Sequence, residues 1–192
     1  MPPKAKFTRD EIIAAALQIV REQGMDAVTS RELGKRLGSS ACPIFTVFAN
    51  MDEVNAALLD AVRACYREYI AEGLSEELAF RGVGTAYIKF ALREPRFFRL
   101  LFMTEQKNPT DIGHTLILID ESYDKILRSV QEPYGLSEED AKRLYQHLWI
   151  YTHGIAALCA TRVCTFTDEE IQTMMAEIFL SLLKEIKREA VK

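Results

Sequence analysis

Apolar residues recur along most of this chain with the three- and four-residue spacing of an amphipathic α-helix. The first set is Ile13, Ala16, Leu17 and Val20, and Gly24 follows them where a helix commonly ends. The alternating pattern of a β-strand is nearly absent, and the chain has only 9 glycines and 6 prolines. The sequence therefore predicts an all-α fold, with helices over residues 8–23, 29–37, 40–46, 51–71, 75–94, 95–104, 109–131, 138–163 and 168–188.

Five of these helices begin with a pair of residues that can cap a helix. In each pair a side-chain oxygen stands three residues before a carboxylate, so that both groups can accept hydrogen bonds from unpaired N–H groups of the first turn. The pairs are Thr8 with Glu11, Thr29 with Glu32, Asn50 with Glu53, Ser137 with Asp140, and Thr167 with Glu170. They support the all-α prediction independently of the hydrophobic pattern.

The two short helices over 29–37 and 40–46 follow a longer helix and are joined by a tight turn at Gly38. This is the layout of a helix-turn-helix unit, although a plain three-helix scaffold has the same spacing. The long helix over 51–71 would join this segment to a larger helical body. We therefore expect a helix-turn-helix domain over residues 1–50 and a second domain over residues 51–192.

Charge is distributed unevenly between these two parts. The chain has a formal net charge of −4, which does not suggest a general nucleic-acid binder. Residues 1–48, however, carry seven basic and five acidic side chains, whereas the remainder carries 17 basic and 23 acidic ones. A mildly basic head on an acidic body is the asymmetry expected when only the head meets phosphate.

Nothing in the sequence predicts a membrane segment, a secretory leader or a metal site. No apolar run reaches the length of about 18 residues that spans a bilayer, and the N-terminus lacks the apolar stretch of a signal peptide. We expect a cytoplasmic protein with reduced cysteines, and the chain has no Cys-x-x-Cys pair for zinc. No cofactor is expected.

The segment from Gly24 to Asn50, Gly-Met-Asp-Ala-Val-Thr-Ser-Arg-Glu-Leu-Gly-Lys-Arg-Leu-Gly-Ser-Ser-Ala-Cys-Pro-Ile-Phe-Thr-Val-Phe-Ala-Asn, resembles the DNA-binding head of TetR-type transcriptional repressors. The body resembles a C-terminal type of the same family, on the run from Tyr87 to Phe102 and on the Trp149-x-x-x-His153-Gly154 signature. The resemblance implies an N-terminal helix-turn-helix head joined to a helical body that binds an effector and forms dimers.

The resemblance also implies a role for individual residues of the head. Thr29 would cap the second helix and contact a phosphate, and Arg31, Lys35 and Arg36 would lie near the DNA backbone. Residues 39–46 would form the recognition helix, with Ile44 and Phe48 facing inward. The complete set of expected DNA-binding residues is Thr29, Arg31, Lys35, Arg36, Ser39, Ser40, Ala41, Cys42, Phe45, Thr46 and Asn50.

Three positions of the head depart from the family pattern. Phe45 stands where a tyrosine is usual, Thr46 where histidine or arginine is common, and Met51 where a lysine commonly follows the cap. Each departure removes an expected contact to phosphate. Either the affinity for DNA would then be modest, or the operator would be read more through apolar contacts, such as that of Ala41 with a thymine methyl group.

The aromatic residues of the body have two interpretations. They can form an ordinary helical core, or they can line an apolar cavity for a small effector, and family resemblance favours the cavity. The expected lining residues are Tyr87, Phe102, Tyr123, Trp149 and His153, and the expected effector is an apolar or aromatic small molecule. The last two helices would pair with those of a second chain, with Leu158, Met175, Ile178 and Leu182 in the dimer interface.

These expectations describe a ligand-responsive repressor that binds a pseudo-palindromic DNA operator as a homodimer. An enzyme is the first alternative, but the sequence has no paired Glu-x-x-His motifs, phosphate-binding glycine loop or nucleophile elbow. The second alternative is a helical interaction module of the same fold with weak or lost DNA binding, which the departures at Phe45 and Met51 would favour.

Overall fold

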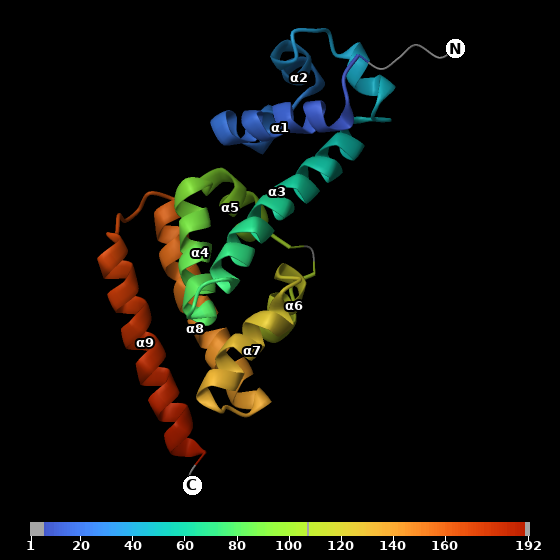
Figure 1. Ribbon diagram of the computed structural model, residues 1–192. Helices are drawn as coiled ribbons and strands as arrows, with labels where there is room; N and C mark the ends of the chain where they lie inside the picture. Colours follow the sequence, from blue (N-terminus) through green and yellow to red (C-terminus); the bar gives the residue numbers. More distant parts are fainter. Residues whose placement is uncertain (1–5, 107, 191–192) are drawn as a thin grey trace. The chain divides into compact units, whose positions relative to one another are not determined.

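The computed structural model describes residues 6–106 and 108–190, and within these ranges it contains nine α-helices, two 3-10 helices and no strand (Figure 1). The all-α prediction is therefore confirmed. In chain order the elements are α1 (Arg9–Gln23), η1 (Met25–Ala27), α2 (Ser30–Arg36), η2 (Cys42–Thr46), α3 (Met51–Leu74), α4 (Ala79–Arg93), α5 (Pro95–Phe102), α6 (Ile112–Ile119), α7 (Tyr123–Tyr134), α8 (Glu138–Ala160) and α9 (Asp168–Glu189).

All five expected helix starts are present. Thr8 and Thr167 form reciprocal capping boxes with Glu11 and Glu170, in which each side chain accepts a hydrogen bond from the other residue's N–H group. The side chains of Thr29, Asn50 and Ser137 accept hydrogen bonds from the N–H groups of Glu32, Glu53 and Asp140 at 3.2, 2.9 and 3.1 Å. Local hydrogen bonding thus explains where α1, α2, α3, α8 and α9 begin.

The single helix predicted over 109–131 is wrong, because the structure has two helices there. Asp120 ends α6, and its buried carboxylate accepts a hydrogen bond from the Ser122 N–H group at 2.8 Å. Such a local bond offers the backbone a turn in place of the helix. The first of the two helices begins at Ile112 rather than near Pro109, with Asp111 accepting a hydrogen bond from the His114 N–H group as its cap.

The chain divides into two compact units. The head unit holds the residues up to Tyr66 together with Arg96–Met103, and the body unit holds Arg67–Pro95 and the residues from Thr104 onward. Helix α3 runs from one unit into the other. In the head unit the buried side chains of α1, α2, η2, α3 and the segment after η2 form an apolar core, and its largest fully buried members include Ile12, Ile19, Leu33, Ile44, Phe48 and Leu58.

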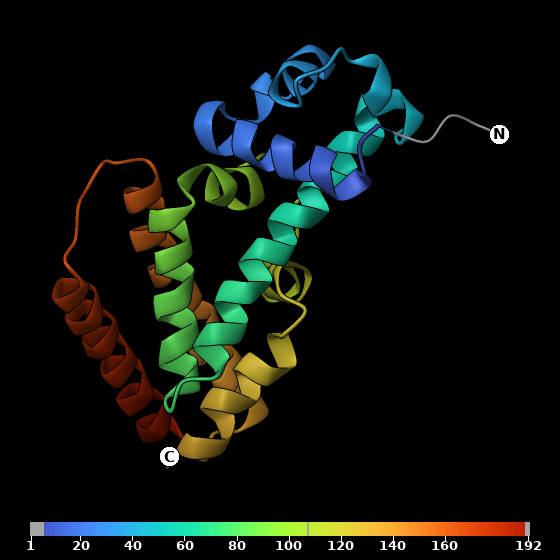
Figure 2. The ribbon, with the colours of Figure 1, turned by 45° about the horizontal axis from the view of Figure 1, so that its top comes forward.

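The body unit is a helical bundle in which α4 and α8 pack against each other, with α7 and α9 beside them (Figures 1 and 2). Helices α3 and α4 approach each other closely at Gly73 and Gly82. A Cβ atom added to Gly82 would lie only 2.2 Å from the carbonyl oxygen of Gly73, so this approach needs a glycine. Phe90 and Ala91 of α4 and Leu144 of α8 are fully buried in this bundle. No helix in the described part of the chain is long and apolar enough to cross a membrane.

Candidate nucleic-acid interface and ligand-binding unit

The turn that follows α2 depends on two glycines. Gly38 has a φ of +64°, in the left-handed region that glycine adopts most easily. Gly34 lies inside α2, where a Cβ would be only 2.9 Å from the carbonyl carbon of Ser40. The carbonyl oxygen of Gly34 accepts a hydrogen bond from the Ser39 N–H group at 2.8 Å. Residues 39–41 therefore pack directly onto α2, and this contact sets where the next element begins.

That element, η2, is shorter than the predicted recognition helix and is a 3-10 helix. It covers Cys42–Thr46, and residues 39–41 belong to the turn before it. Pro43 lacks an N–H group and stands in its first turn, which a helix tolerates because N–H groups there have no internal partner. The prediction of a helix over residues 40–46 is thus correct in place but wrong in type and first residue.

Two buried side chains fix which face of η2 is outermost. Ile44 and Phe48 are 0% and 1% exposed, which confirms that they face inward. Ser40, Cys42, Phe45 and Thr46 are exposed, Phe45 by 43%. Ser39 and Ala41 are half-buried. No residue from Ser39 to Thr46 carries a charge, and the Thr46 hydroxyl donates a hydrogen bond to the Pro43 carbonyl oxygen at 2.7 Å.

The four expected DNA-binding side chains of α2 and its cap lie in different environments. Arg31 is exposed, and the Lys35 ammonium group is 3.9 Å from the Glu32 carboxylate on a side chain that is 79% exposed. Thr29 uses its hydroxyl oxygen as the helix cap. These exposed cations can approach an anionic polymer without breaking a strong internal contact, since exposed ion pairs of this kind are weak.

Arg36 differs from the other cations because it is held against α1. Its guanidinium group pairs with the Glu22 carboxylate through both terminal nitrogens, one of them 2.8 Å from Oε1. The hydrogen bond to Arg36 holds the pKa of Glu22 below its usual value. Fourteen residues separate the two side chains, so no local sequence pattern marked this pair. The geometry gives Arg36 the task of holding α2 against α1.

A second tie joins α1 to the segment after η2. The Arg9 guanidinium group lies 4.3 Å from the centre of the Phe48 ring and 2.8 Å from the Glu53 carboxylate. That carboxylate also accepts a hydrogen bond from the Ala49 N–H group, which, more than the Arg9 contact, lowers the pKa of Glu53. Asn50, expected to meet DNA, uses its side-chain oxygen to cap α3. Sequence reasoning predicted the Asn50 cap but missed the contacts of Arg9 and the bond from Ala49 to Glu53.

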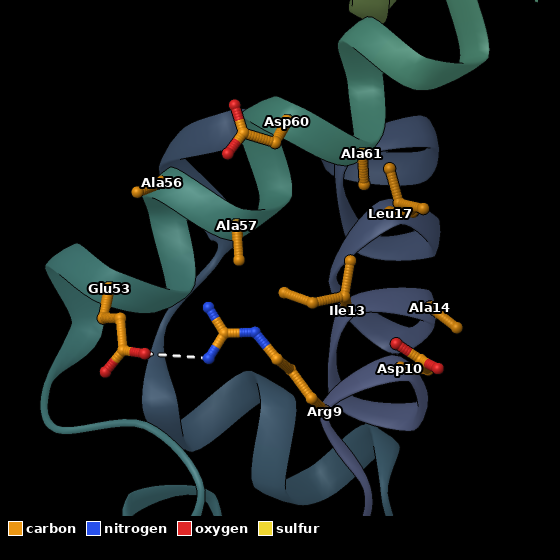
Figure 3. A pocket seen from close by; sticks show the side chains of 10 residues that line it. All are labelled: Arg9, Asp10, Ile13, Ala14, Leu17, Glu53, Ala56, Ala57, Asp60 and Ala61. Atoms are coloured by element: carbon orange, nitrogen blue, oxygen red, sulfur yellow. Dashed lines mark hydrogen bonds and ion pairs between the residues drawn. The ribbon is translucent and has the colours of Figure 1, made fainter.

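Arg9 and Glu53 also belong to a groove of about 480 Å³ between α1 and α3 (Figure 3). Alanine side chains form much of its wall, and three carboxylates, those of Asp10, Glu53 and Asp60, surround it. Arg9 is the only cation among the described residues that line it, and it points at Glu53. Arg9 is engaged by Glu53, so the described lining offers phosphate little, which leaves the exposed face of α2 and η2 as the better candidate for DNA.

The body unit brings three of the five expected pocket residues together. The Tyr87 hydroxyl lies 3.0 Å from Nδ1 of His153, whose ring stacks on Trp149 with the ring centres 4.9 Å apart. Burial raises the pKa of Tyr87 and lowers that of His153, which favours the neutral form of both groups, and the two side chains share one hydrogen bond. His153 of α8 is thus hydrogen-bonded to Tyr87 of α4, and the bond joins the two helices.

The other two expected pocket residues, Tyr123 and Phe102, each pack against different aromatic rings. Tyr123 packs on Tyr145 with the ring centres 5.7 Å apart, also within the body unit. Phe102 belongs to the head unit, where its ring is 5.1 Å from that of Tyr66 and 5.2 Å from that of Phe98. Phe102 lies on α5, in the head unit, whereas the other four expected pocket residues lie in the body unit.

A groove of about 660 Å³ opens in the body unit between α4, α7, α8 and α9. Phe80, Tyr134 and Phe179 form its aromatic wall, and Arg81 and Gln172 also line it. None of the five expected pocket residues lines this groove. The sequence showed Phe80 among the aromatic residues of the body, but periodicity within single helices does not reveal which side chains of different helices face a common space.

The four expected interface residues differ in their exposure. Leu158 of α8 is 36% exposed, whereas Met175, Ile178 and Leu182 of α9 are half-buried. Met175 points into its own unit, because its Sδ atom lies 3.5 Å from the Thr152 hydroxyl and its Cε atom 3.3 Å from a Cβ placed on Gly84. Ile150, at 53% exposure on α8, extends the apolar surface around Leu158 and was not expected.

Comparison with protein-family models gives two matches that together cover most of the chain. Residues 12–58 match the model described as bacterial regulatory proteins, tetR family. Residues 80–181 match the model described as tetracyclin repressor-like, C-terminal domain. A comparison with curated proteins finds no match.

Solved structures of the same fold cover nearly the whole chain at low sequence identity. A transcriptional regulator from Rhodococcus sp. Rha1 is 15% identical with a TM-score of 0.63, over 93% of this chain and 97% of that one. The fatty acid degradation regulator FadR from Bacillus halodurans is 16% identical with a TM-score of 0.59, over 94% and 97%. A TetR variant from Acinetobacter baumannii AYE, in complex with minocycline, is 22% identical with a TM-score of 0.51, over 95% and 96%.

Proposed function

The chain belongs to the TetR family of bacterial regulatory proteins, and from this premise we propose that it is a ligand-responsive repressor that binds a pseudo-palindromic DNA operator as a homodimer. Family membership makes it a DNA-binding regulator of transcription rather than an enzyme. The repressor role, the dimer, the operator and the effector are our proposal. An operator-binding regulator works beside the chromosome, which places it in the cytoplasm.

One observation carries the DNA-binding part of the proposal. Arg31 and Lys35 of α2, Ser40 of the turn and Cys42 of η2 are exposed, and Ile44 anchors the buried face of η2. The alternative surface of the head unit, the groove between α1 and α3, carries three carboxylates. Phosphate contacts provide most of the affinity of such proteins, and the exposed cations of α2 supply them.

The proposed contacts divide by chemistry. Arg31 and Lys35 contact phosphates, and Thr29 stands beside them. Ser39, Ser40, Ala41, Cys42 and Phe45 meet base edges or sugars, while Thr46 and Asn50 lie at the edge of the contact. Arg36 holds α2 in position through Glu22. The functional border between the DNA-binding domain and the body is proposed at residues 50 and 51, where α3 begins.

The body supplies the proposed response to an effector. A TetR variant of the same fold was solved in complex with minocycline, which supports a ligand site in this unit. A ligand that binds one arrangement of the body more tightly shifts the population of DNA-competent dimers. The proposed effector is an apolar or aromatic small molecule.

A specific observation favours a second candidate function, a helical interaction module with weak or lost DNA binding. Phe45 has no hydroxyl, Met51 has no charge, and the Thr46 hydroxyl is engaged by the Pro43 carbonyl oxygen. The head therefore presents fewer phosphate-binding groups around η2 than its family pattern would supply. The experiment below separates the two functions.

DNA binding is tested by fluorescence anisotropy with duplex fragments that flank the chain's own gene, at several salt concentrations. We expect binding that weakens steeply with salt, because each phosphate contact releases a counterion. Arg31→Ala and Lys35→Ala should each weaken binding to every fragment and reduce the slope of log affinity against log salt by about one. Arg128→Ala, which removes an exposed arginine from α7, is the matched control.

Two results would contradict the proposal. A folded protein that binds no fragment even at low salt favours the interaction module. A loss on Arg31→Ala that is confined to one sequence contradicts the phosphate role of that side chain.

A further inference from the structure

The groove between α4, α7, α8 and α9 has the shape and chemistry of a ligand site that is separate from the Tyr87–His153 cluster. Its volume of about 660 Å³ falls in the range of small-molecule pockets, which is about 300–1,000 Å³. Leu148 and Leu180 add aliphatic surface to the aromatic wall, and Leu180 is 62% exposed although it is a large apolar side chain. A ligand that covers this exposed leucine removes apolar surface from water, which favours binding.

The aromatic wall is built from three helices. The Phe179 ring of α9 lies 6.1 Å from the Phe80 ring of α4 and 5.2 Å from the Tyr134 ring of α7, measured between ring centres. Phe80 is held in turn by Tyr145 at 5.9 Å. Rings at these distances and tilted angles present both edges and faces, so a flat aromatic ligand can stack on one ring and meet the edge of another.

One cation stands at this groove. Arg81 is exposed near the start of α4 and reaches across to α9, where its guanidinium group donates a hydrogen bond to Oε1 of Gln172 at 2.7 Å. Within the described part of the chain Arg81 forms no ion pair, and Glu77, the only carboxylate among the described lining residues, does not pair with it. A guanidinium group has five N–H donors, so most of its capacity for a carboxylate is unused.

The groove also stays open in the proposed dimer. Met175 is the expected interface residue that also lines the groove, and it packs inside its own unit against Thr152. Successive residues of an α-helix are rotated by about 100°, so Leu180, which lines the groove, and Ile178, assigned to the dimer interface, point to nearly opposite sides of α9. A second chain against Ile178 and Leu158 would therefore leave the groove accessible to a small molecule.

From these observations we propose that the groove binds an aromatic carboxylate, with its ring against Phe80, Tyr134 and Phe179 and its carboxylate on Arg81. The proposal rests on the proposed function in taking the body as the ligand-binding part of the regulator. It deepens that function by moving the effector site to α4, α7, α8 and α9 and by giving the effector a negative charge.

The test is isothermal titration calorimetry of the full chain with 2-naphthoate, in the absence of DNA, so that a failure of DNA binding does not affect the result. The neutral isostere 2-naphthamide should bind about fivefold more weakly, and Arg81→Gln should weaken 2-naphthoate binding by a similar factor, because an ion pair at an exposed rim contributes up to about 1 kcal/mol. Arg93→Gln, on the last turn of the same helix, should have no effect.

Ala176→Phe tests the location, because Ala176 is exposed and lines the groove, so a larger side chain fills it without disturbing the core. We expect it to abolish binding while circular dichroism stays unchanged, and Thr173→Phe replaces it if that variant does not fold. Equal binding of both probes with no effect of Arg81→Gln overturns the anion preference. Unchanged binding in the filled variant, or no binding of 2-naphthoate to the natural chain, overturns the site.

Discussion

Single side chains of the head unit have two kinds of task, and their contacts within the head separate them. Arg31 and Lys35 are exposed and available to DNA, whereas Arg36 and Arg9 connect elements of the head to each other. The sequence alone treated Arg31, Lys35 and Arg36 alike, because residue type and spacing do not show which carboxylate lies opposite. The Glu22 partner of Arg36 comes from α1 and is visible only after the fold brings the two helices together.

Gly34 is the residue on which the helix-turn-helix turn depends most directly. Gly34→Ala would place a methyl group 2.9 Å from the carbonyl carbon of Ser40, and the backbone cannot move away cheaply. We expect a loss of about 1–3 kcal/mol in the free energy of unfolding, measured by urea denaturation, together with weaker DNA binding.

Ser30→Ala is the control, since it introduces the same residue into the same helix at a position that already carries a Cβ atom, and it should change stability by less than about 0.5 kcal/mol. Equal stability of the two variants would show that the turn can relax around the added methyl group.

At the scale of elements, capping residues made five helix starts predictable. The one break that the sequence analysis missed, between α6 and α7, lies at a capping-type residue whose role was not recognised. Five starts were marked by a polar side chain and a carboxylate three residues later, and all five are present. The break between α6 and α7 was missed because Asp120 was read as an interior residue of an apolar helix. Its carboxylate ends the helix through a bond to Ser122, a local signal that hydrophobic spacing obscures.

The same caps make the fold sensitive to acid. Bonds from the backbone N–H groups of Ala49 and Thr167 lower the pKa of Glu53 and Glu170 in the folded chain. A carboxyl whose folded pKa is lowered stabilises the fold at pH values above its unfolded pKa, near 4.5, and this stabilisation is lost as the pH falls through the folded pKa. We expect the thermal midpoint, followed by circular dichroism, to fall from pH 5 to pH 3.

The double variant Glu53→Gln with Glu170→Gln keeps a hydrogen-bond acceptor at each cap but cannot titrate there. Its midpoint should be lower than that of the natural chain at pH 7 and should fall less between pH 5 and pH 3. Parallel curves for the two proteins would mean that other carboxyls dominate the acid response.

At the scale of the whole molecule, the fold and the family were predictable from the sequence, whereas the set of residues that lines the effector pocket stays a prediction. The order of glycines, caps and apolar positions in residues 24–50 identified the head. By contrast, the expected pocket set was drawn from both compact units, with Phe102 in the head and Tyr87 in the body. Which aromatic side chains share a cavity depends on how helices pack, and a single sequence carries little information about that.

The proposed dimer is tested through the apolar surface of α8. Leu158→Glu should shift the mass measured by light scattering from about twice 21.8 kDa toward the monomer, because a charge would be buried without a partner. Leu158 is a better position than Met175, which packs inside its own unit against Thr152.

Leu92→Glu, a charge at a 46% exposed leucine of α4, is the matched control and should leave the mass unchanged. A natural chain that elutes as a monomer would contradict the dimer, and with it the pairing of two half-sites about 34–36 Å apart.

The uncharged recognition element has a consequence for the genome that the regulator searches. Guanine is read best by arginine or lysine in the major groove, and residues 39–46 offer neither. Small hydroxyl, thiol and methyl groups discriminate weakly between bases, so related operators can drift in sequence and still be occupied. Such a regulator would govern a scattered set of promoters with graded occupancy, rather than one promoter defined by a strict consensus.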